Sequence, residues 1–170
     1  AKALGGVHLF GAESPATVRL GIIGCGGIMG THVKGLVTRG EKVSIAWLCD
    51  VDPGQVDRMA GFMSGFQPAP AKRTARYEDV IEDKDVDACI IATPHHWHVP
   101  IALRAMLAGK DVYIEKPISH VYAEGPIIIA AAQKLGRVVQ QGSQMRSSAV
   151  TLKAEQLLKD GIIGEVKVAR

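Results

Sequence analysis

Three consecutive residues, Glu115, Lys116 and Pro117, follow an apolar run at 111–114 that is typical of a buried strand. Buried strands exclude unpaired charge because it is costly to desolvate, so these charges indicate the edge of a sheet. A partly desolvated Lys116 there can hydrogen-bond and polarise a substrate hydroxyl, while Glu115 holds the lysine or reaches a cofactor. Pro117 restricts Lys116 to extended backbone, and their bond is a candidate cis peptide. The alternative is a surface turn of mixed charge.

Glycines follow an earlier apolar run, at 17–23. Gly24, Cys25 and Gly26 provide a tight turn and bare backbone, which let a pyrophosphate approach a helix N-terminus. In a G-x-G-x-x-G pattern the third glycine would fall at Met29, and here Gly30 comes one residue late. The glycines alone therefore leave a plain strand-to-helix turn as the alternative.

Asp50 ends the next apolar run, 24 residues after Gly26. A carboxylate at this place accepts hydrogen bonds from an adenosine ribose and repels a 2′-phosphate. Val51 and Asp52 follow it, and neither is an arginine that would accommodate that phosphate. The pattern favours NAD over NADP, with a simple strand-ending turn as the alternative for Asp50.

The segment 93–100, "TPHHWHVP", follows a strand expected at 87–92. Ligands of open parallel sheets lie outside the carboxyl ends of the strands, so this loop should face the same crevice as the glycines. His95, His96 and His98 invite a metal interpretation, but adjacent histidines point apart and no further ligand is near. We expect no metal, and favour rings packed beside a dinucleotide. His32 and His120 have no assigned partner.

These residues require a regular scaffold, and the hydrophobic pattern predicts one. Strands and helices alternate, which predicts a parallel sheet covered on both faces, an α/β doubly wound architecture. Strands are expected at 17–23, 42–50, 87–92, 111–114 and 137–141, and a further one begins near 164. Helices are expected at 27–40, from 53 onward after an Asp52 cap, at 77–82, 100–108 and 121–135, and between Ser147 or Ser148 and Gly161, with a loop at 65–72.

Composition narrows the function classes. The chain has 170 residues, a net charge of +3 and 5% aromatic residues, so basic or stacking surfaces for nucleic acid or membranes are not indicated. Cys25, Cys49 and Cys89 are odd in number and lie in apolar runs, which predicts buried free thiols. No apolar run reaches the ~18 residues of a membrane-spanning helix.

Together the motifs resemble the N-terminal half of the Gfo/Idh/MocA family of NAD(P)-dependent oxidoreductases. The resemblance extends over about residues 17–170 and rests on the combination of motifs. They are "GIIGCGGIMGTH" from Gly21, "CD" at Cys49, "ATPHHWHVPIALRAMLAGK" from Ala92, "EKP" from Glu115 and "GSQMRSS" from Gly142.

The resemblance implies roles for particular residues. The backbone of Gly26, Gly27, Ile28 and Met29 would cradle the pyrophosphate, and Asp50 would bind the adenosine ribose. Thr93 and Pro94 would line the cofactor, with His96 and His98 toward the nicotinamide. Glu115 and Lys116 match the family's strand-end pair, in which the lysine contacts nicotinamide ribose and substrate. Gln144 matches a polar residue near the nicotinamide.

The resemblance also implies how the chain is organised. We expect residues 1–16 to be disordered or the remnant of an export signal, and 17–163 to form an NAD-binding Rossmann domain. Residues 164–170 would begin the first strand of a C-terminal α+β substrate domain that the chain lacks, and a homo-oligomer would form through that domain. Cytoplasmic location is the default expectation, and twin-arginine export to the periplasm is the alternative.

The resulting prediction is the NAD-binding domain of an oxidoreductase that transfers a hydride between a sugar, cyclitol or related polyol and nicotinamide. Lys116 is its expected catalytic residue, and we expect the fragment to be inactive alone. Two alternatives are open: an NAD-dependent glycosidase that uses transient oxidation, and a non-catalytic NAD-binding sensor or repressor.

Overall fold

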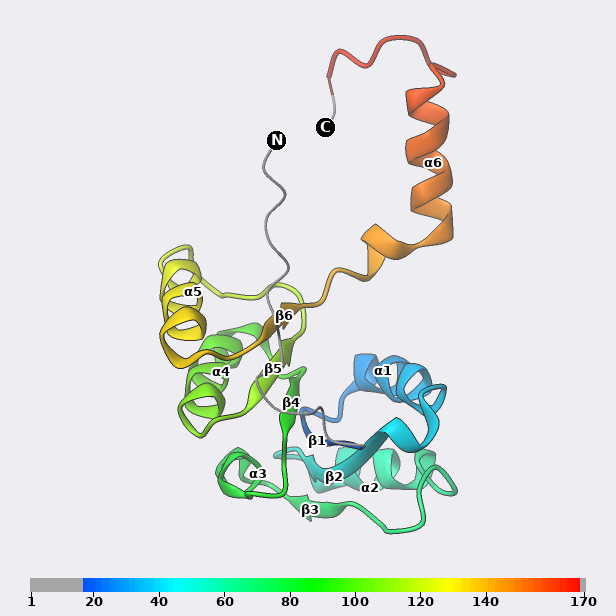
Figure 1. Cartoon of the computed structure of the whole chain (residues 1–170). Helices are drawn as coiled ribbons and strands as arrows, with labels where there is room; N and C mark the ends of the chain where they lie inside the picture. The colour runs from blue at the N-terminus through cyan, green and yellow to red at the C-terminus, as the bar shows by residue number, and fades with distance from the viewer. Residues whose placement is uncertain (1–16, 169–170) are drawn as a thin grey trace.

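The structure is a computed structural model that describes residues 17–168. A parallel six-stranded sheet in the order β3-β2-β1-β4-β5-β6 forms its centre (Figure 1). The strands are β1 (Val18–Ile23), β2 (Val43–Cys49), β3 (Lys72–Thr74), β4 (Ala88–Ile91), β5 (Asp111–Ile114) and β6 (Val139–Gln141). This is the strand order of a doubly wound dinucleotide-binding fold, so the predicted Rossmann-type α/β class is confirmed.

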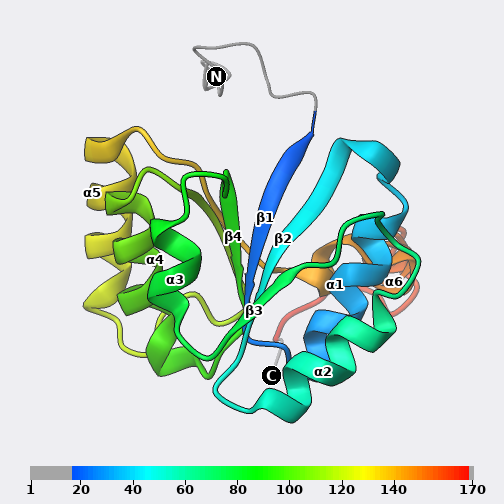
Figure 2. The ribbon, with the colours of Figure 1, turned by 90° about the horizontal axis from the view of Figure 1, so that it is seen from below.

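Helices cover both faces of the sheet, as Figure 2 shows: α1 and α2 lie on one face, and α3, α4 and α5 on the other. The helices are α1 (Gly27–Val37), α2 (Pro53–Phe62), α3 (Tyr77–Glu82), α4 (His98–Leu107), α5 (Glu124–Leu135) and α6 (Ala149–Lys159). Three 3₁₀ turns accompany them: η1 (Gly40–Lys42), η2 (His95–Trp97) and η3 (Gln144–Ser147). Coverage on both faces explains why the inner strands β1, β2 and β4 are mainly apolar, whereas the edge strands β3 and β6 are polar.

The core has two halves, one on each face of the sheet. Neighbouring residues of a strand point to opposite faces, so Ile22 and Ile23 of β1 enter different halves. Ile22 packs with Met29 and the helices α1 and α2, whereas Ile23 packs with Met106 and the helices α3 to α5. Because β1 is packed by both halves of the core, the position of the turn that follows it is fixed.

Helix ends agree with the sequence in part. Asp52 caps α2 as predicted, since its side chain accepts a 2.8 Å hydrogen bond from Gly54 N. α1 ends at Val37, three residues before Gly40, and Gly40 uses its positive φ of 60° to begin η1 instead. α4 begins at His98, ahead of the predicted start, and Pro100 fits within its first turn.

One observed strand was not predicted, and one predicted strand is not tested by the described residues. β3 was not expected; its three residues pair with β2 through Trp47↔Lys72 and its neighbours, a contact between distant segments that local pattern does not reveal. Residues 164–168 are irregular, and the strand of a further domain expected from 164 stays a prediction. Helix α6 precedes these residues, and Figure 1 shows it projecting from the sheet. Every residue of α6 is at least partly exposed. The expectations for 1–16 concern residues outside the described range.

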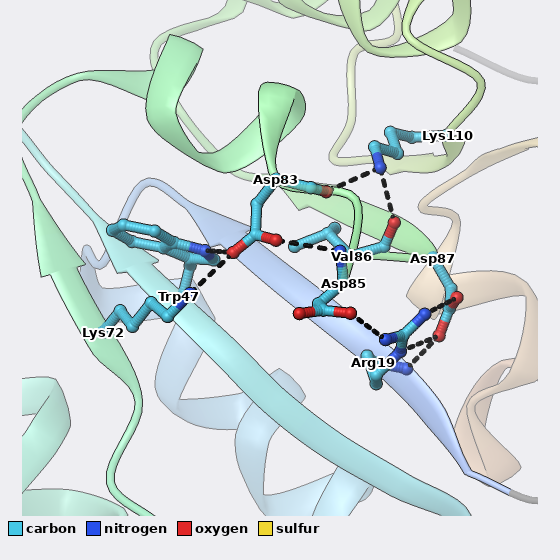
Figure 3. Close-up of polar contacts among 8 residues, drawn as sticks. All are labelled: Arg19, Trp47, Lys72, Asp83, Asp85, Val86, Asp87 and Lys110. Atoms are coloured by element: carbon cyan, nitrogen blue, oxygen red, sulfur yellow. Dashed lines mark hydrogen bonds and ion pairs between the residues drawn. The ribbon is translucent and has the colours of Figure 1, made fainter.

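Polar contacts fasten the amino ends of the strands (Figure 3). Lys110 lies just before β5, and its ammonium group donates 2.7 Å hydrogen bonds to the carbonyl oxygens of Asp83 and Val86. Only 7% of Lys110 is exposed. A buried ammonium group is costly unless its donors are satisfied, so these bonds tie the start of β5 to the loop between α3 and β4.

The side chain of Asp83 is a second junction. Its carboxylate accepts a 2.7 Å hydrogen bond from Trp47 Nε1 and a 2.9 Å ion-pair contact from Lys72 Nζ (Figure 3). The hydrogen bond from Lys72, followed by that from Trp47, holds the pKa of Asp83 well below its usual range. Asp83 therefore stays ionised and joins α3 to β2 and β3.

Arg19 pairs with two carboxylates at the same end of the sheet. Its guanidinium lies 2.9 Å from Asp87 and 2.7 Å from Asp85 (Figure 3). The hydrogen bond from Arg19 lowers the pKa of Asp87, despite the opposing effect of burial. The pair joins the start of β1 to the start of β4, and the carboxyl ends are left free for chemistry.

Candidate functional site

The turn after β1 brings the glycine backbone to the carboxyl edge of the sheet. Gly24 has a φ of 93°, and a Cβ there would lie 2.6 Å from the backbone of Ala92, so only glycine fits. Gly26 is the extended N-cap of α1 and has no side-chain cap. A Cβ on Gly26 or Gly27 would meet no atom within 4 Å, so this backbone faces open space. The first N–H groups of α1 are thus accessible to an anion.

Asp50 lies directly beside this turn, at the end of β2. Its Oδ2 accepts a 2.8 Å hydrogen bond from Cys25 N, and its Oδ1 accepts a 3.0 Å bond from Asp52 N. These bonds fix the carboxylate, yet each oxygen keeps a second lone pair for a hydroxyl. Asp50 therefore has free acceptor positions beside the glycine turn, and its predicted contact with a ribose stays a prediction.

Arg58 is a residue of this region that the sequence analysis did not identify. It comes from α2, and its Nη2 lies 3.5 Å from the carbonyl oxygen of Cys25. With Gly26, Gly27 and Gly30 it lines a hollow of about 380 Å³. Arg58 lies near the middle of α2, one helical turn after Gln55. A basic residue on the helix that follows β2 was the available signal, because that helix packs beside the glycine turn. Arg58 therefore brings a guanidinium group close to the glycine turn and the start of α1.

A cleft of about 480 Å³ opens between the ends of β1, β2 and β4. Gly24, Gly26, Asp50, Thr93, Pro94 and His96 are among its lining residues, together with the exposed ring of Trp97. The Oγ1 of Thr93 is buried and has no hydrogen-bond partner in the described residues. A buried hydroxyl without a partner is costly, which suits a site that a polar ligand completes. The residues present therefore fit a dinucleotide.

His98 has a different environment from the neighbouring histidines. It is buried, with 1% exposed, and its Nδ1 and Nε2 lie 2.7 Å and 2.8 Å from the carbonyl oxygens of Pro117 and Thr93. Neither nitrogen is free for a ligand, so the ring connects the loop after β4 to the turn after β5. His96 is exposed on the cleft, and direct contact of His98 with a cofactor stays a prediction that this geometry does not favour.

Glu115 and Lys116 end β5 as predicted, but in contrasting environments. Glu115 is buried, and it contacts His32 at 2.6 Å and also the amide of Gln144. The side chain of Lys116 is exposed, and the Lys116–Pro117 peptide is cis, which confirms that expectation. The structure thus brings Glu115 and Gln144 together, and adds His32, for which no partner was expected.

The cysteines near the site are inert. Cys25, Cys49 and Cys89 are buried free thiols, as predicted. Burial raises the pKa of Cys25 and of Cys49 to about 12, and the negative charge of Asp50 adds to the effect. Both thiols therefore stay protonated near neutral pH, which disfavours nucleophilic thiolate chemistry at this edge.

Metal and membrane features can be stated for the described part of the chain. Within residues 17–168, no group of three or more His, Cys, Asp or Glu side chains is arranged to hold a metal ion. His95 and His120 rings lie 4.8 Å apart at their centroids, next to His96, without forming such a group. No helix in the same range is long and apolar enough to cross a membrane.

Curated relatives resemble the chain over most of its length. It is 33% identical over 158 residues to a glycosyl hydrolase family 109 protein of Saccharopolyspora erythraea, covering 91% of this chain and 34% of that protein. It is 31% identical over 150 residues to inositol 2-dehydrogenase of Salmonella typhimurium, covering 88% and 44%. The chain thus matches 34% and 44% of the length of these two relatives.

Solved structures share the fold. Myo-inositol 2-dehydrogenase of Lactobacillus plantarum superposes with a TM-score of 0.74 at 24% identity, covering 88% of this chain and 43% of that one. The WlbA dehydrogenase of Chromobacterium violaceum, solved with NADH and UDP-GlcNAcA, gives a TM-score of 0.74 at 23% identity, covering 85% and 40%.

The family comparison extends over the whole sheet. Residues 18–143 match the family described as an oxidoreductase family with an NAD-binding Rossmann fold. The match spans β1 to β6 and includes the glycine turn, Asp50 and the Glu115–Lys116 pair. The chain belongs to the Gfo/Idh/MocA oxidoreductase family, and the matched region is its NAD-binding Rossmann fold.

Proposed function

We propose that this chain is the NAD-binding part of an oxidoreductase that transfers a hydride between a carbon of a sugar, cyclitol or related polyol and nicotinamide. One observation carries the proposal: the glycine turn, Asp50, Thr93 and Lys116 all lie at the carboxyl ends of adjacent parallel strands. Ligands of this fold bind at that edge. A relative named inositol 2-dehydrogenase, and a dehydrogenase of the same fold solved with UDP-GlcNAcA, support the substrate class.

Different residues of the cleft would bind different parts of the cofactor. The N–H groups at the start of α1, with Arg58 beside them, would hold the pyrophosphate. Asp50 would accept hydrogen bonds from the adenosine ribose, and its charge would oppose a 2′-phosphate. Thr93 and Pro94 would line the path toward the nicotinamide. When bound, NAD supplies the hydride acceptor.

Lys116 would act on the substrate. Its side chain is exposed at the sheet edge, and an ammonium group there can donate a hydrogen bond to the hydroxyl of the carbon that is oxidised. This contact stabilises negative charge on the oxygen as the proton leaves. The group that takes this proton is not assigned to the described residues, so Lys116 provides one part of the chemistry.

A second candidate is favoured by the glycosyl hydrolase family 109 relatives, one of which is 33% identical. In that case the same edge would hold NAD permanently, and transient oxidation of a glycoside would precede cleavage of its glycosidic bond. The two functions differ in their products. Net NADH formation from a polyol supports the dehydrogenase, whereas release of free sugar without NADH accumulation supports the glycosidase.

The test uses the intact protein and two variants. Lys116→Met should retain NAD binding within about threefold, because it removes a single solvent-exposed contact to the nicotinamide ribose and leaves the backbone in place, and it should lose turnover by about 10²-fold or more. Asp50→Arg should lose NAD binding and turnover together. If Lys116→Met leaves function intact while Asp50→Arg abolishes it, the protein is an NAD sensor and the enzymatic proposal fails.

Assembly belongs to the same proposal. A homo-oligomer in the intact protein is expected, and light scattering on a chromatographically purified sample gives its mass directly. A monomer at micromolar concentration would contradict it. Absence of nucleic-acid and membrane partners is likewise an expectation, drawn from the small net charge of +3.

A further inference from the structure

Glu115 carries a buried charge at the end of β5, where only 5% of its side chain is exposed. A buried carboxylate is costly unless donors surround it. Three donors do: His32 Nε2 lies 2.6 Å from Oε1, Lys116 N donates to Oε2 at 2.9 Å, and the amide of Gln144 also reaches Oε1. The carboxylate is therefore a junction between α1, η3 and the backbone after β5.

The two side-chain donors differ in how firmly they are held. His32 lies on α1 between Met29 and Val33, both fully buried, and its ring meets that of Tyr113 edge-on with centroids 5.1 Å apart. Gln144 lies on an exposed 3₁₀ turn. An ionised carboxylate only accepts, so Nε2 of His32 carries the hydrogen. His32 is thus the donor that the core holds in place.

Gly142 closes the carboxylate in from another direction. A Cβ at this position would lie 3.2 Å from Oε1 of Glu115 and 2.8 Å from Oη of Tyr113. The backbone after β6 thus passes against the carboxylate, and the Glu115 side chain has little room to turn away from His32. Packing and hydrogen bonding both specify one position for the carboxylate.

Lys116 depends on that position through its backbone. Its side chain is exposed, and its ammonium group bonds to no acceptor among the described residues, whereas its N–H is held by Oε2 of Glu115. A continuous line of contacts therefore runs from α1 through His32 and Glu115 to the Lys116 N–H. The helix that begins at the glycine turn is connected to the lysine at the substrate edge.

We infer that His32 is a positioning residue, which fixes Glu115 and through it the backbone of Lys116. The inference rests on the proposed function, in which α1 meets the pyrophosphate of NAD and Lys116 meets the nicotinamide ribose and substrate. The contacts from His32 to Glu115 and from Glu115 to the Lys116 N–H would thus couple the position of the pyrophosphate to the position of the catalytic lysine. No role in proton transfer is assigned to His32.

Amide hydrogen exchange tests the contact itself, by NMR on the isotope-labelled chain. His32→Leu removes the donor and His32→Asn places its amide too close to α1 to reach Glu115, whereas His32→Gln carries an amide of similar reach to Nε2. We expect exchange of the Lys116 N–H to quicken by about tenfold or more in the first two variants, the effect of a lost charged hydrogen bond. His32→Gln should restore slow exchange. Thr31→Leu, an exposed neighbour on α1, is the matched control.

NAD titration of the same variants tests the consequence. His32→Leu and His32→Asn should bind NAD about five- to tenfold more weakly, with His32→Gln and Thr31→Leu within about twofold of the starting protein. If His32→Leu fails to fold, the Asn and Gln pair decides. Unchanged Lys116 exchange in folded His32→Asn overturns the inference, whatever the affinity. Failure of the unsubstituted chain to bind NAD would instead contradict the proposed function, and the exchange result would still decide the role of His32.

Discussion

The Oδ2 of Asp50 accepts a 2.8 Å hydrogen bond from the backbone N–H of Cys25, so the end of β2 is joined to the glycine turn after β1. One carboxylate thereby serves two purposes. It satisfies an N–H of the turn and holds its own free lone pairs toward the cleft. The carboxylate that would recognise adenosine is therefore held in place by contacts within the chain.

Asp50→Ser tests that relationship. Removal of the carboxylate should weaken NAD binding by about tenfold or more, since hydrogen bonds to a charged group are lost. NADP should gain relative to NAD, because its 2′-phosphate no longer meets a negative charge. Calorimetry with both cofactors measures the ratio. Asp57→Ser removes an exposed carboxylate from α2 and is the control; an equal loss of NAD affinity there would assign the effect to net charge alone.

Gly24→Ala should destabilise the fold. The positive φ of Gly24 and the 2.6 Å approach to Ala92 predict a loss of about 2–4 kcal/mol in the free energy of unfolding. Gly30→Ala is the matched control, because no atom lies within 4 Å of its Cβ position and helix propensity favours alanine by about 0.5–1 kcal/mol. Urea denaturation measures both. Equal stability of the two variants would show that the turn is not constrained.

Asp83 should make stability sensitive to acid. Its pKa is lowered in the fold by Lys72 and Trp47, so its contribution is complete above its unfolded pKa of about 4 and is lost as pH falls below that value. Asp83→Asn should cost about 1–3 kcal/mol at pH 7, and this difference should shrink as pH falls toward 3.

The measurement uses urea denaturation at several pH values, with Trp47 emission isolated by a Trp97→Phe background, since the chain has two tryptophans. Trp47 contacts Asp83 directly and reports this junction. If the free energies of unfolding of the Asp83 and Asp83→Asn proteins differ by the same amount from pH 7 to pH 3, the contacts of Asp83 do not lower its pKa.

Lys110 and Lys116 lie at opposite ends of β5, and their replacement by methionine should affect different properties: stability for Lys110 and turnover for Lys116. Lys110→Met leaves the carbonyls of Asp83 and Val86 without their donor and should lower the free energy of unfolding by about 2–4 kcal/mol. Lys116→Met, at an exposed position, should change it by less than about 0.5 kcal/mol. Denaturation and turnover together distinguish them: Lys110→Met should retain turnover per folded molecule, and a stable, inactive Lys110→Met would reverse the assignment.

Much of the fold follows from local pattern. β1, β2, β4 and β5 were predicted because each is a mainly apolar run bounded by glycine or charge, β6 was predicted within 137–141, and α3 was predicted at its observed bounds. Element order then gave the fold class, since alternating strands and helices require a parallel sheet. The glycine turn and Asp50 were found because their spacing is a property of neighbouring elements.

What was missed depends on contacts between distant residues. β3 has only three residues, two of them basic, and exists because β2 offers it an edge. His32 and Glu115 are 83 positions apart, so no spacing could connect them. A buried glutamate at a strand end does demand donors, and a histidine between Met29 and Val33 on the inner side of α1 was the available signal.

NAD binding by this chain is the central claim, and titration calorimetry with NAD and NADP measures it directly. The account predicts one NAD site per folded chain, with NADP bound at least about tenfold more weakly because its 2′-phosphate meets Asp50. A folded chain that binds neither dinucleotide, or that binds NADP more tightly, would contradict it.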